Sequence, residues 1–226
     1  MKITIFGSCR QDSLYSNEKY EITKIQNDIS FPHYTKEILE LIKFIKYNTM
    51  KPEETVNTFR SPILTKIPIY SENYKDELLN TDVFIIEIAS KISYLYNNRY
   101  VHHILYDDSK NFTNEDIKQN IIKRIEDDKE IENDILEIVK ELNTKKIIII
   151  GHIVTYEHGE RYKLLKLLEE ICKKYNILFI NPVKELTKRE YDIYELTVKE
   201  RVISHYNEKG HKIISSIYDE YINSII

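Results

Sequence analysis

The stretch Lys2-Ile3-Thr4-Ile5-Phe6-Gly7-Ser8-Cys9-Arg10 decides the fold that the sequence predicts. β-Branched and aromatic residues run up to the glycine and predict a first β-strand, which ends there. In an open parallel sheet, residues that follow the carboxyl end of a strand lie at the edge where such sheets bind ligands. The hydroxyl of Ser8 and the thiol of Cys9 are therefore candidate nucleophiles. The alternative is a small residue chosen only for a tight turn.

The composition favours one α/β domain without a strong charge. The chain has 226 residues, enough to bury a sizeable core, and a formal net charge of −4. Lysine-rich segments are interleaved with glutamate, which is typical of solvated helix faces. We therefore expect neither nucleic acid nor a membrane surface as a partner.

The cysteine spacing and the length of the apolar segments predict where in the cell the protein is found. Cys9 and Cys172 are far apart in the sequence and indicate neither a disulfide framework nor a metal site. No segment has the pattern of a signal peptide or the length of a membrane span. We therefore expect a cytoplasmic protein without a bound metal, and the sequence predicts no oligomeric state.

Predicted strands and helices alternate along the rest of the chain. This order is typical of a parallel sheet covered on both faces, so we predict a single doubly wound, flavodoxin-like, three-layer domain over residues 1–226 with a mainly parallel sheet. After the first strand, the predicted strands cover residues 20–25, 82–90, 145–150 and 177–180, and the main predicted helices cover residues 35–45, 72–79, 114–143, 160–175 and 207–226. The acidic stretch Asp127-Asp128-Lys129 could split the helix over residues 114–143.

Further polar residues are expected at the same sheet edge. Glu87 lies inside an apolar strand, where a carboxylate must face a cation, a ligand or the strand end. A purely architectural ion pair with Lys91 or Arg99 explains it equally well. The neighbours His102 and His103 are a weak metal signal, because successive side chains of a strand point to opposite faces.

The segment His205-Tyr206-Asn207-Glu208-Lys209-Gly210-His211 places a histidine just before the last predicted helix. Together with Phe6-Gly7-Ser8-Cys9, it resembles the first and last blocks of the SGNH/GDSL hydrolase family. That resemblance implies that Ser8 is the nucleophile, that its backbone N–H is an oxyanion donor, and that His205 is the general base.

Three features depart from that family. Val202 replaces the acid three residues before the histidine, so a backbone carbonyl, Glu200, Asp192 or no group at all would orient His205. The second-block glycine has no counterpart, and Ile88-Ala89-Ser90-Lys91 stands in place of the third block. The oxyanion hole would then be rebuilt from the His33 loop, Arg60 or Ser90, or hydrolysis would be lost.

The predicted function is a serine-dependent acyl-ester hydrolase or acyltransferase acting on an acylated carbohydrate or a similar small ester. The stretch Phe31-Pro32-His33-Tyr34-Thr35 is also similar to relatives that transfer acyl groups in polysaccharide biosynthesis. A transferase would need an acyl donor such as acyl-CoA, and no other cofactor is expected. The alternative is an inactive module of the same fold that binds carbohydrate or a nucleotide-sugar.

Six residues beside the predicted dyad are candidates for substrate binding or the oxyanion hole: Cys9, Arg10, His33, Arg60, Ser90 and His152. Cys9 could replace Ser8 as the nucleophile, since a nearby arginine or helix N-terminus favours a thiolate. Arg10 and Arg60 could bind a carboxylate, a phosphate or a sugar, or form structural salt bridges. His33 lies in the loop before the helix predicted over residues 35–45, and His152 follows the strand predicted over residues 145–150. Each could instead be only a turn residue.

Overall fold

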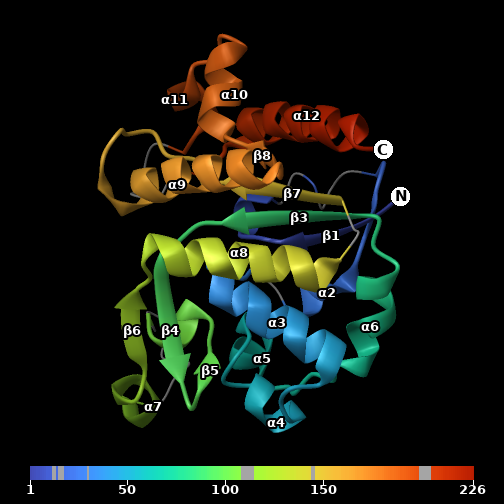
Figure 1. Cartoon of the computed structure of the whole chain (residues 1–226), viewed down its shortest axis with the longest axis vertical. Helices are drawn as coiled ribbons and strands as arrows, with labels where there is room; N and C mark the ends of the chain where they lie inside the picture. Colours follow the sequence, from blue (N-terminus) through green and yellow to red (C-terminus); the bar gives the residue numbers. More distant parts are fainter. Residues whose placement is uncertain (12–13, 15–17, 30, 108–114, 144–145, 199–204) are drawn as a thin grey trace.

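The centre of the molecule is a five-stranded parallel sheet (Figure 1). The computed structural model describes residues 1–11, 14, 18–29, 31–107, 115–143, 146–198 and 205–226. The strand order is β2-β1-β3-β7-β8, and every pair is parallel. The predicted mainly parallel α/β sheet is thus confirmed. Its strands are β1 (Lys2–Phe6), β2 (Glu21–Ile22), β3 (Val83–Ile88), β7 (Lys146–Gly151) and β8 (Leu178–Ile180).

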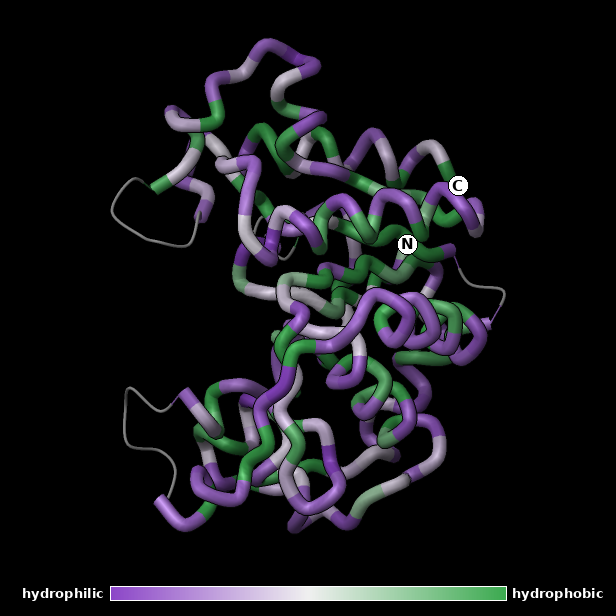
Figure 2. The backbone as a smooth tube through the Cα atoms, turned by 60° about the vertical axis from the view of Figure 1, so that its left-hand side comes forward, coloured by the Kyte–Doolittle hydropathy of each residue, from purple (hydrophilic) through white to green (hydrophobic). Residues whose placement is uncertain are grey.

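Helices cover both faces of this sheet and complete three layers. Alternate residues of β3 face opposite layers: Phe84 and Ile86 contact one core cluster, whereas Ile85 contacts the other. Figure 2 shows the hydrophobic residues concentrated in the central strands and on the inner sides of the helices. The first cluster includes helices α2 (Lys24–Asp28), α3 (Thr35–Tyr47), α6 (Glu72–Leu79), α8 (Asp128–Leu142) and α9 (Gly159–Tyr175), and the second includes α10 (Pro182–Lys188), α11 (Ile193–Leu196) and α12 (Glu208–Ser224).

A small antiparallel sheet follows β3, where the sequence predicts only irregular turns. It has the order β5-β4-β6, and Asn97 and Asn98 connect the first hairpin with positive φ angles of 47° and 61°. Two consecutive left-handed residues form the tight turn that suits the twist of a hairpin. The elements of this region are α4 (Pro52–Thr55), α5 (Arg60–Thr65), β4 (Ile92–Tyr96), β5 (Arg99–Tyr100), η2 (His103–Leu105), α7 (Glu115–Gln119) and β6 (Ile122–Ile125).

Two predicted elements have different bounds in the structure. A continuous helix over residues 114–143 is wrong, because β6 pairs with β4 and separates α7 from α8, which begins at the predicted break. The Asp127 side chain starts α8 by accepting a hydrogen bond from the Glu130 N–H, and the Glu130 side chain accepts one from the Asp127 N–H. The strand predicted over residues 20–25 is only β2, because α2 begins at Lys24 and turns Ile25 into the core.

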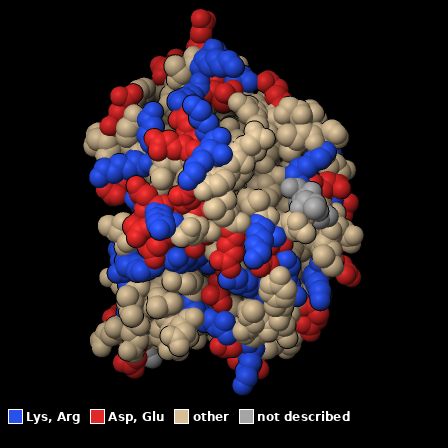
Figure 3. All heavy atoms as spheres, viewed as in Figure 1, with Lys and Arg blue, Asp and Glu red and all other residues tan. Residues whose placement is uncertain are grey.

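Acidic and basic side chains are interspersed over the face seen in Figure 3, as the interleaved lysines and glutamates of the sequence predict. Within the part of the chain that is described, none of the helices combines the length and the hydrophobicity needed to span a bilayer.

Candidate active site

The turn after β1 sends Ser8 and Cys9 in opposite directions. Gly7 lies directly against β3, where a Cβ at this position would be 3.0 Å from the Cβ of Glu87. The chain then enters the short helix η1 (Cys9–Gln11). As a result, the Ser8 side chain is buried and 1% exposed, whereas Cys9 is exposed at the carboxyl edge of the sheet.

His205 meets Cys9 at this edge. Its Nε2 lies 3.6 Å from the Cys9 sulfur, which is hydrogen-bond distance for a thiol. The segment that carries His205 is held on both sides: the Val198 N–H donates to the His205 carbonyl, and Thr197 forms a β-bridge with Tyr206. Two residues nearly 200 positions apart thus form a thiol–imidazole pair.

The start of α12 fixes the position of this histidine loop. The Asn207 side chain accepts a hydrogen bond from the Gly210 N–H and begins the helix, as the sequence predicts. Gly210 packs so closely that a Cβ would lie 2.1 Å from the Leu196 carbonyl oxygen. A larger residue at this position would push α12 and its preceding loop away from the sheet.

Ser8 belongs to a buried polar network beneath Cys9. Its Oγ donates to Glu87 Oε2 at 2.5 Å, and its N–H donates to the same oxygen at 2.8 Å. Arg10 Nη1 donates to Ser8 Oγ at 2.8 Å. The structure therefore directs the Ser8 hydroxyl and N–H to Glu87, not to His205 or to the space above the turn.

Glu87 is the centre of this network and is ionised. Burial alone would raise its pKa, but the hydrogen bond from His152 and the charge of Arg10 outweigh that effect, so the pKa lies well below its usual range. His152 Nδ1 lies 3.3 Å from Glu87 Oε1. Burial lowers the pKa of His152 to about 4, although Glu87 opposes this shift, and the imidazole is therefore neutral near pH 7.

Arg60 and His33 approach the same edge from the neighbouring loops. The guanidinium of Arg60 stacks over the Phe31 ring at 4.8 Å. Burial lowers the Arg60 pKa, and the negative form of Cys9 acts in the opposite direction, which places this cation within electrostatic reach of the thiol. His33 is anchored through its backbone: its N–H donates to Glu37, and its carbonyl accepts from the Ala89 and Ser90 N–H groups.

The histidines of the neighbouring loops form a ring cluster. The ring nitrogens of His33, His102 and His103 lie within 4.8 Å of one another, a spacing that could hold a metal ion. His102 and His103 do not diverge as predicted, because they lie at the start of η2 and not in a strand. His102 uses both nitrogens, with Nε2 3.1 Å from the Phe31 carbonyl and Nδ1 accepting from the Ile104 N–H. His33 and His103 stack with ring centroids 4.5 Å apart, so the geometry favours ring packing.

A cavity of about 270 Å³ opens beside this network. It extends from the turn after β1 towards the small sheet, and Ser90 lies in its wall with Oγ accepting from the Ile92 N–H. Its polar lining residues are Arg10, His33, Ser90, His103, Asp107, Lys123 and Arg161. Sequence analysis did not identify Lys123 and Arg161, because both lie in segments that read as amphipathic scaffold.

The structure describes one of the two acids that could orient His205, namely Asp192. The Asp192 side chain accepts from the Tyr194 N–H and caps α11. Glu200 and Val202 lie outside the described residues. The other predicted site residues lie at the carboxyl edge in three groups. Exposed Cys9 lies beside half-buried His205, Ser8, Arg10 and His152 belong to the buried network around Glu87, and His33, Arg60 and Ser90 lie in the neighbouring loops.

No protein-family model and no curated protein matches this sequence. Among solved structures, a lipase/acylhydrolase from Enterococcus faecalis superposes with a TM-score of 0.53 over 99% of this chain and 95% of its own, at 12% identity. The chain shares the fold of this lipase/acylhydrolase. A catalytic mutant of an acetylxylan esterase from Geobacillus stearothermophilus matches the chain at 16% identity, with a TM-score of 0.43 over 96% of this chain and 91% of that one.

Proposed function

We propose that this protein is an acyl-ester hydrolase or acyltransferase in which Cys9 is the nucleophile and His205 is the general base. The observation that carries the proposal is the 3.6 Å separation between Cys9 Sγ and His205 Nε2 at the carboxyl edge of the sheet. A thiol beside an imidazole is an activated nucleophile, because the base can accept the thiol proton. The SGNH hydrolase-like fold supports ester chemistry at this edge by analogy only.

The reaction would follow two balanced half-reactions. In the first, the Cys9 thiol gives its proton to His205 Nε2, and the sulfur attacks the acyl carbon of the ester. The carbon–oxygen bond then breaks, and His205 returns the proton to the leaving alcohol, which leaves a thioester on Cys9. In the second, water or an acceptor hydroxyl attacks the thioester, its proton passes to His205, and Cys9 is released as the thiol.

The family resemblance implies that Ser8 is the nucleophile, but the contacts of Ser8 favour a different role. Its hydroxyl donates to Glu87, and Glu87 holds a negative charge that binds this proton strongly. Ser8 is also buried, so an ester carbonyl cannot reach its oxygen without opening the turn. We infer that Ser8, Glu87 and Arg10 are positioning residues that hold the turn in the form that exposes Cys9.

Arg60 is the group best placed to stabilise charge near the sulfur. Among the described residues, its guanidinium contacts the Phe31 ring and forms no ion pair with a carboxylate. A guanidinium at this position would favour the thiolate and the oxyanion of the tetrahedral intermediate. The substrate we propose is an acylated carbohydrate or a similar small ester, and the final acyl acceptor decides between hydrolysis and transfer.

The test compares neighbouring side chains with a chromogenic short-chain acyl ester as the substrate. We expect Cys9→Ala to abolish turnover and Ser8→Ala to reduce it while leaving measurable activity. Cys172→Ala is the matched control, because Cys172 is buried and burial raises its pKa to about 12. Full activity in Cys9→Ala together with complete loss in folded Ser8→Ala would contradict the proposal and return the nucleophile to the serine.

A further inference from the structure

The cavity beside Cys9 has an excess of positive charge. Three cationic side chains from three separate elements line it: Arg10 from η1, Lys123 from β6 and Arg161 from α9. Asp107 is the acidic residue in the lining, and it is engaged with its neighbours: its Oδ2 lies 3.3 Å from His103 Nδ1 and 3.5 Å from the Tyr94 hydroxyl. The lining therefore carries more cationic than acidic side chains.

Arg161 is the cation whose charge is least compensated. Within the described residues it makes no hydrogen bond or ion pair, although its side chain is partly buried. Burial lowers its pKa, and the neighbouring positive charge of Arg10 lowers it further. The carboxylate of Glu87 acts on both arginines, but it already accepts two hydrogen bonds from Ser8 and lies 3.3 Å from His152 Nδ1. One engaged carboxylate therefore faces two guanidinium groups, and an anionic ligand would supply further negative charge.

Arg10 and Lys123 are the other two cations of the lining. Arg10 donates to Ser8 Oγ and so connects the cavity to the turn that carries Cys9. Lys123 lies over the rings of Tyr94 and Tyr106, 5.8 Å and 5.0 Å from their centroids, which holds its ammonium at the cavity rim. The three cations thus reach from the candidate nucleophile to the outer surface of the small sheet.

We propose that this cavity binds an oxyanion, a carboxylate or a phosphate group carried by the substrate, between Arg161 and Arg10 with Lys123 at the rim. This inference rests on the proposed function, since it assigns an acidic substrate to the same site. Guanidinium groups bind planar and tetrahedral oxyanions through paired hydrogen bonds, and an ammonium adds a point charge. Because Arg10 follows Cys9 directly, the anionic group would lie next to the reacting ester.

Binding of inorganic phosphate, measured by isothermal titration at low ionic strength, tests the oxyanion site without any catalytic step. We expect Arg161→Gln to weaken phosphate binding by about tenfold or more, because a charge-assisted hydrogen bond pair is lost. Lys163→Gln is the matched control: it removes one positive charge from the same helix, where Lys163 pairs with the exposed Glu160. Lys123→Gln gives a second variant at an exposed position and should weaken binding less.

The outcomes separate this inference from the proposed function. Cys9→Ala should bind phosphate as the parent protein does, so loss of turnover in that variant says nothing against the site. Equal phosphate affinity in the parent, Arg161→Gln and Lys163→Gln would overturn the oxyanion site, and so would the absence of phosphate binding by the parent. Either result leaves the Cys9–His205 proposal untouched.

A second measurement identifies which part of the substrate carries the anion. Turnover is compared for O-acetylated glucose, O-acetylated glucuronate and acetyl-CoA in the parent protein and in Arg161→Gln. A selective loss with the glucuronate ester places the carboxylate of an acidic sugar in the cavity, whereas a selective loss with acetyl-CoA places the phosphates of an acyl donor there. Equal effects on the neutral ester and both anionic substrates would overturn the assignment to a substrate anion.

Discussion

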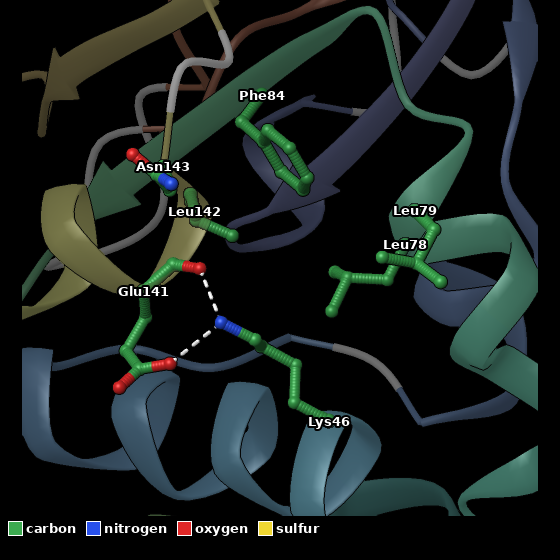
Figure 4. A pocket seen from close by; sticks show the side chains of 7 residues that line it. All are labelled: Lys46, Leu78, Leu79, Phe84, Glu141, Leu142 and Asn143. Carbon is green, nitrogen blue, oxygen red and sulfur yellow. Dashed lines mark hydrogen bonds and ion pairs between the residues drawn. The ribbon is translucent and has the colours of Figure 1, made fainter.

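The two ends of the sheet each hold a cavity of about 270 Å³, and the two cavities differ in how their charges are paired. The cavity near the amino end of β3 has one cation, Lys46, and its Nζ bonds both the side chain and the backbone carbonyl of Glu141, at 2.7 Å and 2.6 Å. Figure 4 shows this pair among the apolar side chains Leu78, Leu79, Phe84 and Leu142. The carboxyl-edge cavity has three cations, and Arg161 pairs with no acid in the described part of the chain.

This difference separates a structural cavity from a candidate binding site. A charge that already has its partner inside the protein gains little from a ligand, whereas an uncompensated buried charge gains a great deal. The cysteines differ in the same way: Cys172 is buried on α9, and Cys9 is exposed beside His205. Both contrasts support the carboxyl edge as the proposed site.

The largest effect is expected for His205→Gln, which removes the base from the carboxyl edge. We expect turnover of the acyl ester to fall about 10²- to 10⁴-fold, the usual contribution of a positioned general base. The pH–rate profile should lose its dependence on a histidine. His158→Gln, at an exposed N-cap of α9, is the control and should keep the parent rate. A parent-like rate and pH profile in His205→Gln would show that the base lies elsewhere.

Glu37→Gln should change how stability depends on pH. Burial raises the pKa of Glu37 to about 8, despite the hydrogen bond from the His33 N–H, so the folded protein holds this carboxyl protonated. The unfolded chain releases the proton near pH 4.5. Stability from this group is therefore complete below pH 4.5 and is lost as the pH rises towards 8. The variant cannot ionise, and its amide oxygen can still accept from His33.

Chemical denaturation across pH 4 to 8 measures this effect. The free energy of unfolding of Glu37→Gln, relative to that of the parent protein, should increase as the pH rises through this range. Glu141→Gln, at the other end of the sheet, should show the opposite sign, with its change at and below pH 4.5, so its series extends to more acidic pH. Burial would raise the Glu141 pKa, but Lys46 lowers it below its usual value, so this carboxylate stabilises the fold above pH 4.5. The same pH trend in both variants would contradict the difference between the two ends.

The smallest effect is expected for Lys46→Met. This variant breaks the Lys46–Glu141 pair, and because both side chains are partly exposed we expect a loss of about 1 kcal/mol in the free energy of unfolding. Ester turnover and phosphate binding should stay at the parent level, as measured in the same assays. A change in phosphate affinity would mean that the two cavities are not independent.

The sequence predicts the central parallel sheet better than the small antiparallel sheet. The central strands are continuous apolar runs, and such runs have few alternatives to a buried parallel strand. The hairpin of β4 and β5 has no clear alternation, and its signal is the Asn97-Asn98 pair, whose left-handed turn could have been inferred. The sequence does not predict β6, because Ile117, Ile121 and Ile125 fit a helical spacing, and only the pairing with β4 shows that residues 122–125 form a strand.

The sequence predicts that the candidate residues gather at the carboxyl edge of the sheet, where the structure places them, but two features of this candidate site require the tertiary structure. Whether Ser8 or Cys9 faces His205 depends on the direction of one turn, and packing of Gly7 against Glu87 sets that direction. The cationic cavity depends on β6 and α9 approaching the turn after β1, since Lys123 and Arg161 lie far from it in the sequence. Neither residue has a local sequence feature that distinguishes it from other surface cations.

Mass spectrometry of the protein quenched during turnover tests the central claim most directly. The protein is mixed with an activated acyl ester, stopped in acid, digested and sequenced by fragmentation. We predict an acyl group on Cys9 in the parent protein. We predict no acyl group on residues 7–10 in Cys9→Ala. An acyl group on Ser8 with Cys9 unmodified would contradict the account.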